Sequence, residues 1–138
     1  MQQEIVRTWM TPNPTTVSPT ATLDEAHQLM KALHVRHLPV VADQRLIGLI
    51  SKTDVYQAKL TVAASEAKEE TAVSPSTVAD VVSSSASLPH IAAHELVATA
   101  AQTMLQHHLT ALPVLENGRL IGILTEADIF RMVIKSSG

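Results

Sequence analysis

The chain has 138 residues, of which 46% are hydrophobic but only 2% aromatic, and its formal net charge is -3. It contains no cysteine, which excludes disulfides, cysteine-ligated metal centres and thiol catalysis. The near-neutral charge and the scarcity of aromatic residues disfavour a nucleic-acid-binding face, and no apolar run approaches the roughly 20 residues that a membrane-spanning helix needs. Because the N-terminal residues also lack the features of a signal peptide, these properties predict a cytoplasmic globular protein.

The first predicted helix lies over residues 23–33. Apolar residues recur there at helical spacing, and Thr22 is a suitable N-cap with Glu25 three residues later. An extended segment at residues 15–17 precedes it. We therefore expect a strand followed by an amphipathic helix.

Two strands and a second helix follow. Short apolar runs predict strands at 38–41 and 46–50, connected by a turn at Asp43-Gln44. The second helix begins at Ser51 and is expected to carry Val55-Tyr56 into the core.

The same order returns 74 residues later, so the sequence is an internal repeat. Leu38-Pro39-Val40-Val41 recurs as Leu112-Pro113-Val114-Leu115, and Asn117-Gly118 is a strong signal for a type I′ hairpin turn. The predicted elements of this half are an extended piece at His90-Ile91, a helix over 96–105, strands at 112–115 and 120–124, and a helix from Thr125 that carries Ile129-Phe130 inward.

A polar segment separates the two halves. Residues 61–76 combine a charged stretch with a Ser-Pro-Ser breaker, and a short helical extension through Ala63-Ala64 is compatible with them. The predicted organisation is a first domain at 1–60, a linker at 61–76 and a second domain at 77–138. A half of this size buries a sheet poorly alone, so we expect the halves to pack into one pseudo-symmetric α+β module with clefts where they meet.

Several motifs resemble those of a known family. They are Val6-Arg7-Thr8-Trp9-Met10-Thr11-Pro12, Arg36-His37-Leu38-Pro39-Val40-Val41, Leu46-Ile47-Gly48-Leu49-Ile50-Ser51-Lys52-Thr53-Asp54, Ala111-Leu112-Pro113-Val114 and Leu120-Ile121-Gly122-Ile123-Leu124-Thr125-Glu126-Ala127-Asp128. In this order, and covering nearly everything but the linker, they resemble a tandem pair of cystathionine-β-synthase (CBS) domains, a Bateman module.

The resemblance implies a regulatory module and not an enzyme. Such a module binds an adenosine-containing ligand such as AMP, ADP or ATP between the paired domains and requires no cofactor. The resemblance further implies a homodimer that passes its signal to an effector protein in trans. The alternative is a structural module that mediates dimerisation and whose clefts stay empty.

Individual ligand contacts are also implied by the resemblance. Asp54 and Asp128 would hold the ribose hydroxyls, Ser51 and Thr125 would face the phosphate, and the adenine would lie against the segment that precedes the first helix of a half (15–17 or 88–91). The implied ligand-binding residues are Thr15, Thr16, Val17, Arg36, His37, Ser51, Thr53, Asp54, Thr110, Ala111, Thr125 and Asp128.

The Ser-x-x-Asp and Thr-x-x-Asp patterns have two compatible interpretations. A hydroxyl at the first turn of a helix suits a phosphate, and a carboxylate accepts from two vicinal hydroxyls. The small residues Gly48 and Gly122 would permit close approach of backbone. The second interpretation is structural: the same patterns match capping boxes, which stabilise the start of a helix and need no ligand.

The two halves differ in charge around this signature. Arg36, His37 and Lys52 of the first half correspond to Thr110, Ala111 and Glu126 of the second. Our hypothesis is that the first site prefers phosphorylated ligands, whereas the second binds weakly, takes a neutral adenosyl group or stays empty. The second half also has Val82-Ser83-Ser84 in place of Met10-Thr11-Pro12.

Seven histidines raise the question of a metal site, but none is predicted. His34-x-x-His37 has a suitable spacing, yet His37 corresponds to Ala111 and no acidic cluster completes the ligand set. His34 and His108 are expected to end the first helix of each half, where a cation complements the helix dipole. Known catalytic motifs are missing, so no catalytic residue is predicted.

Overall fold

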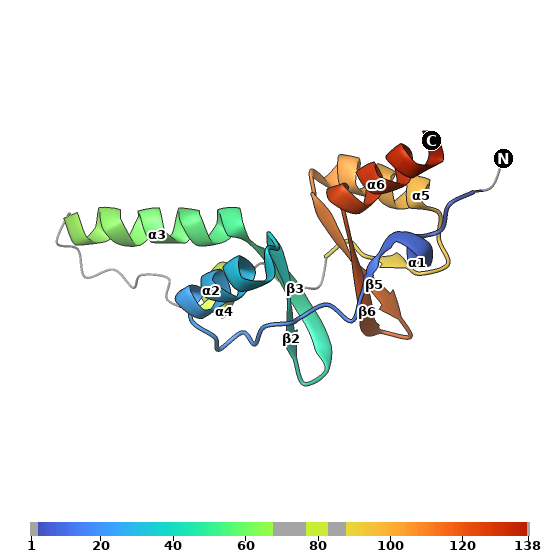
Figure 1. The fold of residues 1–138 in the computed structure, drawn as a ribbon. Helices are drawn as coiled ribbons and strands as arrows, with labels where there is room; N and C mark the ends of the chain where they lie inside the picture. Colours follow the sequence, from blue (N-terminus) through green and yellow to red (C-terminus); the bar gives the residue numbers. More distant parts are fainter. Residues whose placement is uncertain (1–2, 68–76, 83–87, 138) are drawn as a thin grey trace. The chain divides into compact units, whose positions relative to one another are not determined.

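The computed structural model describes residues 3–67, 77–82 and 88–137. Its elements, in chain order (Figure 1), are α1 (Val6–Trp9), β1 (Thr11–Pro12), α2 (Leu23–Leu33), β2 (His37–Ala42), β3 (Arg45–Ser51), α3 (Lys52–Ala67), α4 (Val78–Val81), β4 (Ile91–Ala92), α5 (Val97–His107), β5 (Ala111–Glu116), β6 (Arg119–Thr125) and α6 (Glu126–Ser137). The predicted α+β repeat of helix, two strands and helix is confirmed in both halves.

The chain forms two compact units that do not coincide with the two sequence repeats. One unit is Thr15–Ala86, and the other combines Met1–Pro14 with Ser87–Gly138. We call them the first-repeat unit and the second-repeat unit. The N-terminal segment thus belongs to the unit that contains the second repeat, an exchange that the sequence pattern does not reveal.

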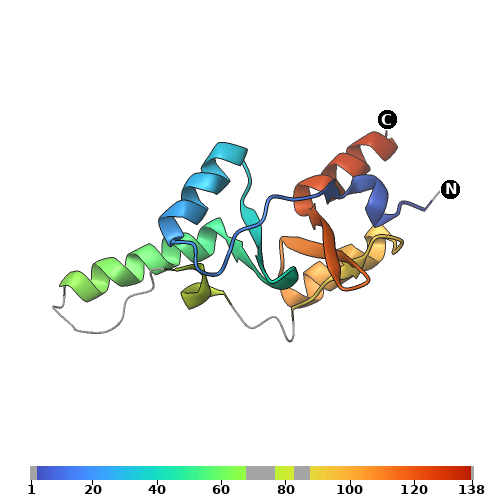
Figure 2. The same cartoon turned by 90° about the horizontal axis from the view of Figure 1, so that it is seen from below.

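In the second-repeat unit, the exchanged segment completes the sheet. The strand order is β1-β6-β5-β4, with β1 antiparallel to β6 and β4 parallel to β5. Helix α1 lies against α6 (Figure 2), and Val6 at its start is completely buried. The backbone N–H groups of Val6 and Arg7 donate to the carbonyls of Glu95 and Ala93, which fixes the segment in place.

In the first-repeat unit, β2 and β3 form an antiparallel pair, and Val17 adds a single parallel bridge to Val40. The extended segment predicted at 15–17 is therefore confirmed at one residue only. Helix α4 belongs to this unit, since the N–H of Val78 donates to the carbonyl of Ala21.

The two hairpins have the same irregularities at corresponding places. The pairing register shifts between Val40 and Val41 in β2, and between Val114 and Leu115 in β5. Both turns use positive φ at both central residues, at +50° and +66° for Asp43 and Gln44 and at +52° and +78° for Asn117 and Gly118. The type I′ prediction is confirmed, and the first turn achieves it without glycine.

A side-chain cap begins the first helix of the first repeat, and a left-handed histidine ends the first helix of both repeats. In α2, Thr22 Oγ1 accepts from the N–H of Glu25 at 3.0 Å, which confirms the predicted cap. His34 and His108 follow α2 and α5 in the left-handed conformation, and their N–H groups donate to carbonyls of the last turn. Both histidines end their helices as expected.

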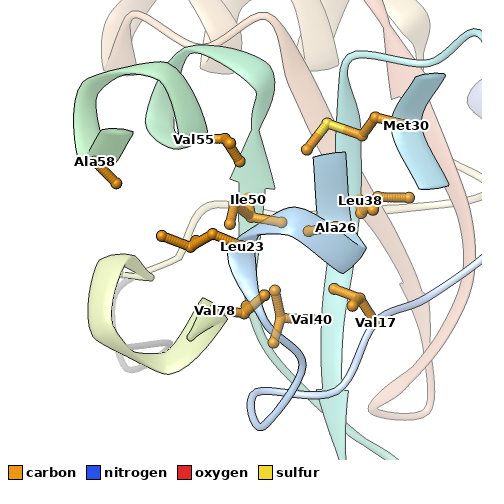
Figure 3. Close-up of a cluster of buried hydrophobic side chains, with 10 residues drawn as sticks. All are labelled: Val17, Leu23, Ala26, Met30, Leu38, Val40, Ile50, Val55, Ala58 and Val78. Carbon is orange, nitrogen blue, oxygen red and sulfur yellow. The ribbon is translucent and has the colours of Figure 1, made fainter. Parts of the chain in front are cut away.

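Each unit has its own aliphatic core. In the first-repeat unit it contains Val17, Leu23, Ala26, Met30, Leu38, Val40, Ile50, Val55, Ala58 and Val78 (Figure 3). In the second-repeat unit it contains Val6, Ile91, Ala93, Val97, Ala100, Met104, Leu112, Val114 and Leu124.

Two predicted core residues are wrong. Val55 is buried, but the neighbouring Tyr56 is 48% exposed, and Phe130 in α6 is 60% exposed. A helix turns about 100° per residue, so two adjacent side chains cannot both point at the core.

Helix α3 continues to Ala67, so the first part of the predicted linker is helical. The rest of that linker, residues 68–76, lies outside the described residues. Within the parts of the chain that the structure describes, no helix has the length and apolar character required to cross a membrane.

Candidate functional site

The strand-to-helix junction of the first repeat is built around Ser51 and Asp54. The N–H of Ser51 donates to Asp54 Oδ2 at 2.9 Å, and the N–H of Asp54 donates to Ser51 Oγ at 3.0 Å. This reciprocal pair caps α3. Among the described residues, Asp54 Oδ1 has no hydrogen-bond donor and Ser51 Oγ has no acceptor, so both atoms can serve a ligand.

Three basic residues lie next to this junction along the backbone. His37 is the cross-strand partner of Ser51 in the β2–β3 register, and the N–H of Lys52 donates to the carbonyl of Arg36 at 2.8 Å. The side chains of Arg36 and Lys52 are exposed, and Lys52 Nζ lies 5.7 Å from the centre of the Tyr56 ring. The structure thus places Arg36, His37 and Lys52 beside the Ser51–Asp54 cap.

The remaining candidates of the first repeat lie apart from this cap. The N–H of Val17 donates to the carbonyl of Pro39, and the N–H of Val41 donates to the carbonyl of Val17, on the edge of β2 opposite β3. The Val17 side chain is buried in the core, which leaves only its backbone for a ligand. Thr15 and Thr16 are exposed next to it, and Thr53 is exposed in the first turn of α3.

The second repeat has the same junction, but its carboxylate accepts more hydrogen bonds than that of the first repeat. The N–H of Thr125 donates to Asp128 Oδ2 at 2.9 Å, and the Thr125 hydroxyl donates to the same oxygen at 3.1 Å. The N–H of Asp128 donates to Thr125 Oγ1 at 3.3 Å. Asp128 is only 4% exposed, so this carboxylate is buried.

An arginine that the sequence analysis did not single out completes this junction. Arg131 Nη1 donates to Asp128 Oδ1 at 2.7 Å, and the two groups form an ion pair. Position 131 corresponds to Gln57 in the first repeat. The i,i+3 spacing of Asp128 and Arg131 on a helix was the available signal.

The flanking positions of the second junction carry no basic side chain. Ala111 is buried and is the cross-strand partner of Thr125, and the N–H of Glu126 donates to the carbonyl of Thr110 at 3.1 Å. Glu126 therefore occupies the place that Lys52 has in the first repeat.

The space beside Gly122, where another residue would have its Cβ, is filled by Met10 and the backbone of Thr11. A Cβ at this position would lie 2.5 Å from Met10 Sδ and 3.0 Å from the carbonyl oxygen of Thr11. Gly122 allows β1 to approach β6, where Pro12 is its pairing partner. Gly122 therefore permits the close approach of backbone that the sequence predicts, and the backbone that approaches is that of β1.

No group of three or more histidine, cysteine, aspartate or glutamate side chains within residues 3–67, 77–82 and 88–137 has the geometry to hold a metal ion.

Comparison with known proteins matches the repeat to one family. The family model described as "CBS domain" matches twice, at residues 5–61 and 78–135. The chain is 32% identical over 124 residues to the CBS domain-containing protein YhcV of Bacillus subtilis, which covers 90% of this chain and 81% of YhcV.

Two further relatives extend the comparison. The chain is 33% identical over 119 residues to inosine-5'-monophosphate dehydrogenase of Korarchaeum cryptofilum, but spans only 21% of that enzyme and 83% of itself. Among solved structures it is similar to CBSX2 in complex with AMP, with a TM-score of 0.80, 26% identity and coverage of 98% of this chain and 99% of the other.

Proposed function

Since the chain belongs to the CBS-domain family, we propose that it is a regulatory module that binds adenosine-containing ligands at the strand-to-helix junctions of its repeats. The observation that carries this proposal is the junction of Ser51 and Asp54. Its carboxylate keeps one oxygen without a donor among the described residues, and basic side chains flank it. The AMP bound by the structural relative CBSX2 agrees with this ligand class.

The first junction offers what a nucleoside phosphate needs. An ionised carboxylate has about four lone-pair positions, and Asp54 uses one of them for the N–H of Ser51, which leaves room for two ribose hydroxyls. Arg36 and Lys52 supply positive charge, and the Ser51 hydroxyl supplies a donor at the start of α3, where backbone N–H groups favour an anion. We infer that this site prefers phosphorylated adenosyl ligands.

The second junction is a poorer site for a phosphate. Glu126 stands where the first repeat has Lys52, and Ala111 stands where it has His37. A like charge close to a phosphate opposes binding. We infer that this site binds a phosphorylated ligand more weakly than the first does.

Calorimetric titration with AMP tests the assignment. Asp54→Ala should weaken binding about 10- to 100-fold, because it removes two charge-assisted hydrogen bonds to ribose. Asp128→Ala should change the stronger binding event little. Equal losses in the two variants would contradict the difference between the sites.

A matched control separates lost ligand contacts from lost capping. Asp80 accepts from the N–H of Thr77 at 3.0 Å and caps α4 with the same spacing, at a position outside either signature motif. Asp80→Ala should lower stability by about 1 kcal/mol and leave AMP affinity unchanged. Loss of AMP binding in this control would show that the Asp54 effect is one of folding.

The phosphate preference has a separate test. Wild-type protein should bind AMP more tightly than adenosine, and the difference should shrink when Arg36 and Lys52 are both replaced by alanine. A thermal-shift screen with AMP, ADP, ATP, S-adenosylmethionine, NAD and cyclic dinucleotides covers other ligands of the class. No stabilisation by any of them would favour the alternative, an interaction module without a ligand.

A repeated apolar surface supports self-association. Tyr56 and Leu60 on α3 correspond to Phe130 and Ile134 on α6, and these four side chains are 48%, 71%, 60% and 72% exposed. Residues four apart lie on the same face of a helix. Exposed apolar faces that recur in both repeats are typical of surfaces covered by another protein, and we propose a homodimer.

Light scattering at micromolar concentration tests the homodimer. The wild type should have the mass of a dimer, and Phe130→Glu with Ile134→Glu should give a monomer that retains its far-UV circular dichroism. The matched control is Gln102→Glu, which adds a negative charge at an exposed position of α5 and should leave the mass unchanged. A monomeric wild type would refute the proposal.

A further inference from the structure

The two signature aspartates differ in a way that the flanking charges do not explain. Asp128 is in an ion pair with Arg131, whose Nη1 lies 2.7 Å from Asp128 Oδ1. The corresponding residue of the first repeat is Gln57, and it makes no hydrogen bond to Asp54. The repeat therefore provides an internal comparison of the same carboxylate with and without an arginine.

The remaining hydrogen-bonding capacity of the two carboxylates is unequal. Asp128 accepts three hydrogen bonds, two at Oδ2 from Thr125 and one at Oδ1 from Arg131. Of about four lone-pair positions in a carboxylate, one remains, whereas Asp54 retains about three. A pair of vicinal hydroxyls needs two. Asp128 can accept both only if one of two side-chain donors, Arg131 or the Thr125 hydroxyl, moves away, and Arg131 is the donor that occupies Oδ1.

We propose that Arg131 is an internal competitor of the ribose at the second junction and lowers its affinity for any adenosyl ligand, phosphorylated or not. The inference rests on the proposed function, because it concerns the same ligand class and the same signature aspartate. It adds a residue of α6 that determines whether the second site is occupied.

The contact is of a kind that a ligand can displace. Arg131 donates to Asp128 through one nitrogen only. The pair therefore lacks the bidentate geometry of the strongest arginine–carboxylate pairs. The Arg131 side chain is 67% exposed, so water can solvate the guanidinium once it leaves. The Asp128 side chain is only 6% exposed, so a ribose can reach this carboxylate only when a neighbouring group moves. Competition should therefore weaken binding without abolishing it.

Reciprocal substitutions test the proposal. In the Asp54→Ala background, where the second site is measured by itself, Arg131→Gln should tighten binding of adenosine by about two- to tenfold. In the otherwise wild-type chain, Gln57→Arg should weaken binding at the first site by a similar factor. Titration calorimetry with adenosine and with AMP measures both.

The matched control is Lys135→Gln, which removes one positive charge from the same helix. Lys135 lies 6.0 Å from the centre of the Trp9 ring. This variant should leave adenosine affinity unchanged if displacement of Arg131 from Asp128, and not the net charge of α6, sets the affinity. Equal gains from Lys135→Gln and Arg131→Gln would overturn the proposal.

The possible failures are distinct. If wild-type protein binds AMP through Asp54 but Arg131→Gln leaves the second site unchanged, competition by Arg131 is refuted and the proposed function stands. If Arg131→Gln weakens AMP binding and leaves adenosine unaffected, Arg131 is a phosphate ligand and the proposal is wrong. If neither the wild type nor any variant binds adenosine or AMP, the proposed function fails and the inference fails with it.

Discussion

The two hairpin turns offer a direct measurement of backbone strain. Gln44 and Gly118 occupy the same place in the two repeats, with φ of +66° and +78°. The left-handed conformation costs a non-glycine residue about 1–2 kcal/mol, whereas glycine adopts it without this cost. Glycine, however, loses about 0.5–1 kcal/mol more conformational entropy on folding, which offsets part of the gain. Gln44→Gly should therefore raise the free energy of unfolding by about 0.5–1 kcal/mol, and Gly118→Gln should lower it by a similar amount.

At both positions the side chain makes few contacts, so the change in stability on substitution should come mainly from backbone conformation. Gln44 is exposed and makes no hydrogen bond to the described residues, and a Cβ at Gly118 would meet no atom within 4 Å. Urea denaturation measures the change. With a slope of about 2 kcal/mol per molar, the midpoint should move by roughly 0.3–0.5 M in opposite directions in the two variants. A lower midpoint for Gln44→Gly would refute the reasoning.

Three further substitutions test the packing described above, each by urea denaturation. Gly122→Ala places a methyl group against Met10 and the Thr11 carbonyl and should cost about 1–3 kcal/mol; an unchanged midpoint would mean that β1 does not lie on β6. Met104→Ala opens a cavity in the core and should cost about 2–5 kcal/mol, whereas Leu105→Ala, at a position that is 78% exposed, should change stability by less than about 0.5 kcal/mol. Comparable losses in those two would show that the face of α5 is assigned wrongly. Thr22→Ala removes the cap of α2 and should cost about 1 kcal/mol, and a neutral result would argue against the hydrogen bond to the N–H of Glu25.

Local signals in the sequence were sufficient for the two main helices and the hairpin of each repeat, whereas α1, β1 and α4 were not predicted. The cap at Thr22, the Asn117-Gly118 turn and the paired strands depend on residues close together in the chain, and each is confirmed. Internal repetition added a second, independent sample of these helices and hairpins. The prediction for Tyr56 and Phe130 failed because hydrophobicity alone does not say whether a side chain packs inside its own unit or faces outward.

Contacts between residues far apart in the sequence could not be predicted from local sequence patterns. The alignment of the repeats places residues 1–14 with the first copy, but the sheet that receives them is formed by the second. In the candidate site, Ser51 with Asp54 and Thr125 with Asp128 were predicted because they lie within one turn of helix. Arg131 was missed, since a charged pair at this spacing is common on exposed helices and nothing in the sequence shows that its partner is buried.

The exchange of the N-terminal segment determines how the protein is made and how it can be divided. Pro12 leaves the ribosome long before its pairing partner Gly122, which lies 110 residues further along the chain. Strand β1 therefore waits through most of synthesis before it can join its sheet, and contacts of such long range slow folding. A fragment cut at the sequence boundary before residue 77 would leave β6 without β1 and Val6 without its burial site. An excised second-repeat unit needs residues 1–14 joined to residues 87–138, which requires an internal deletion and not a truncation.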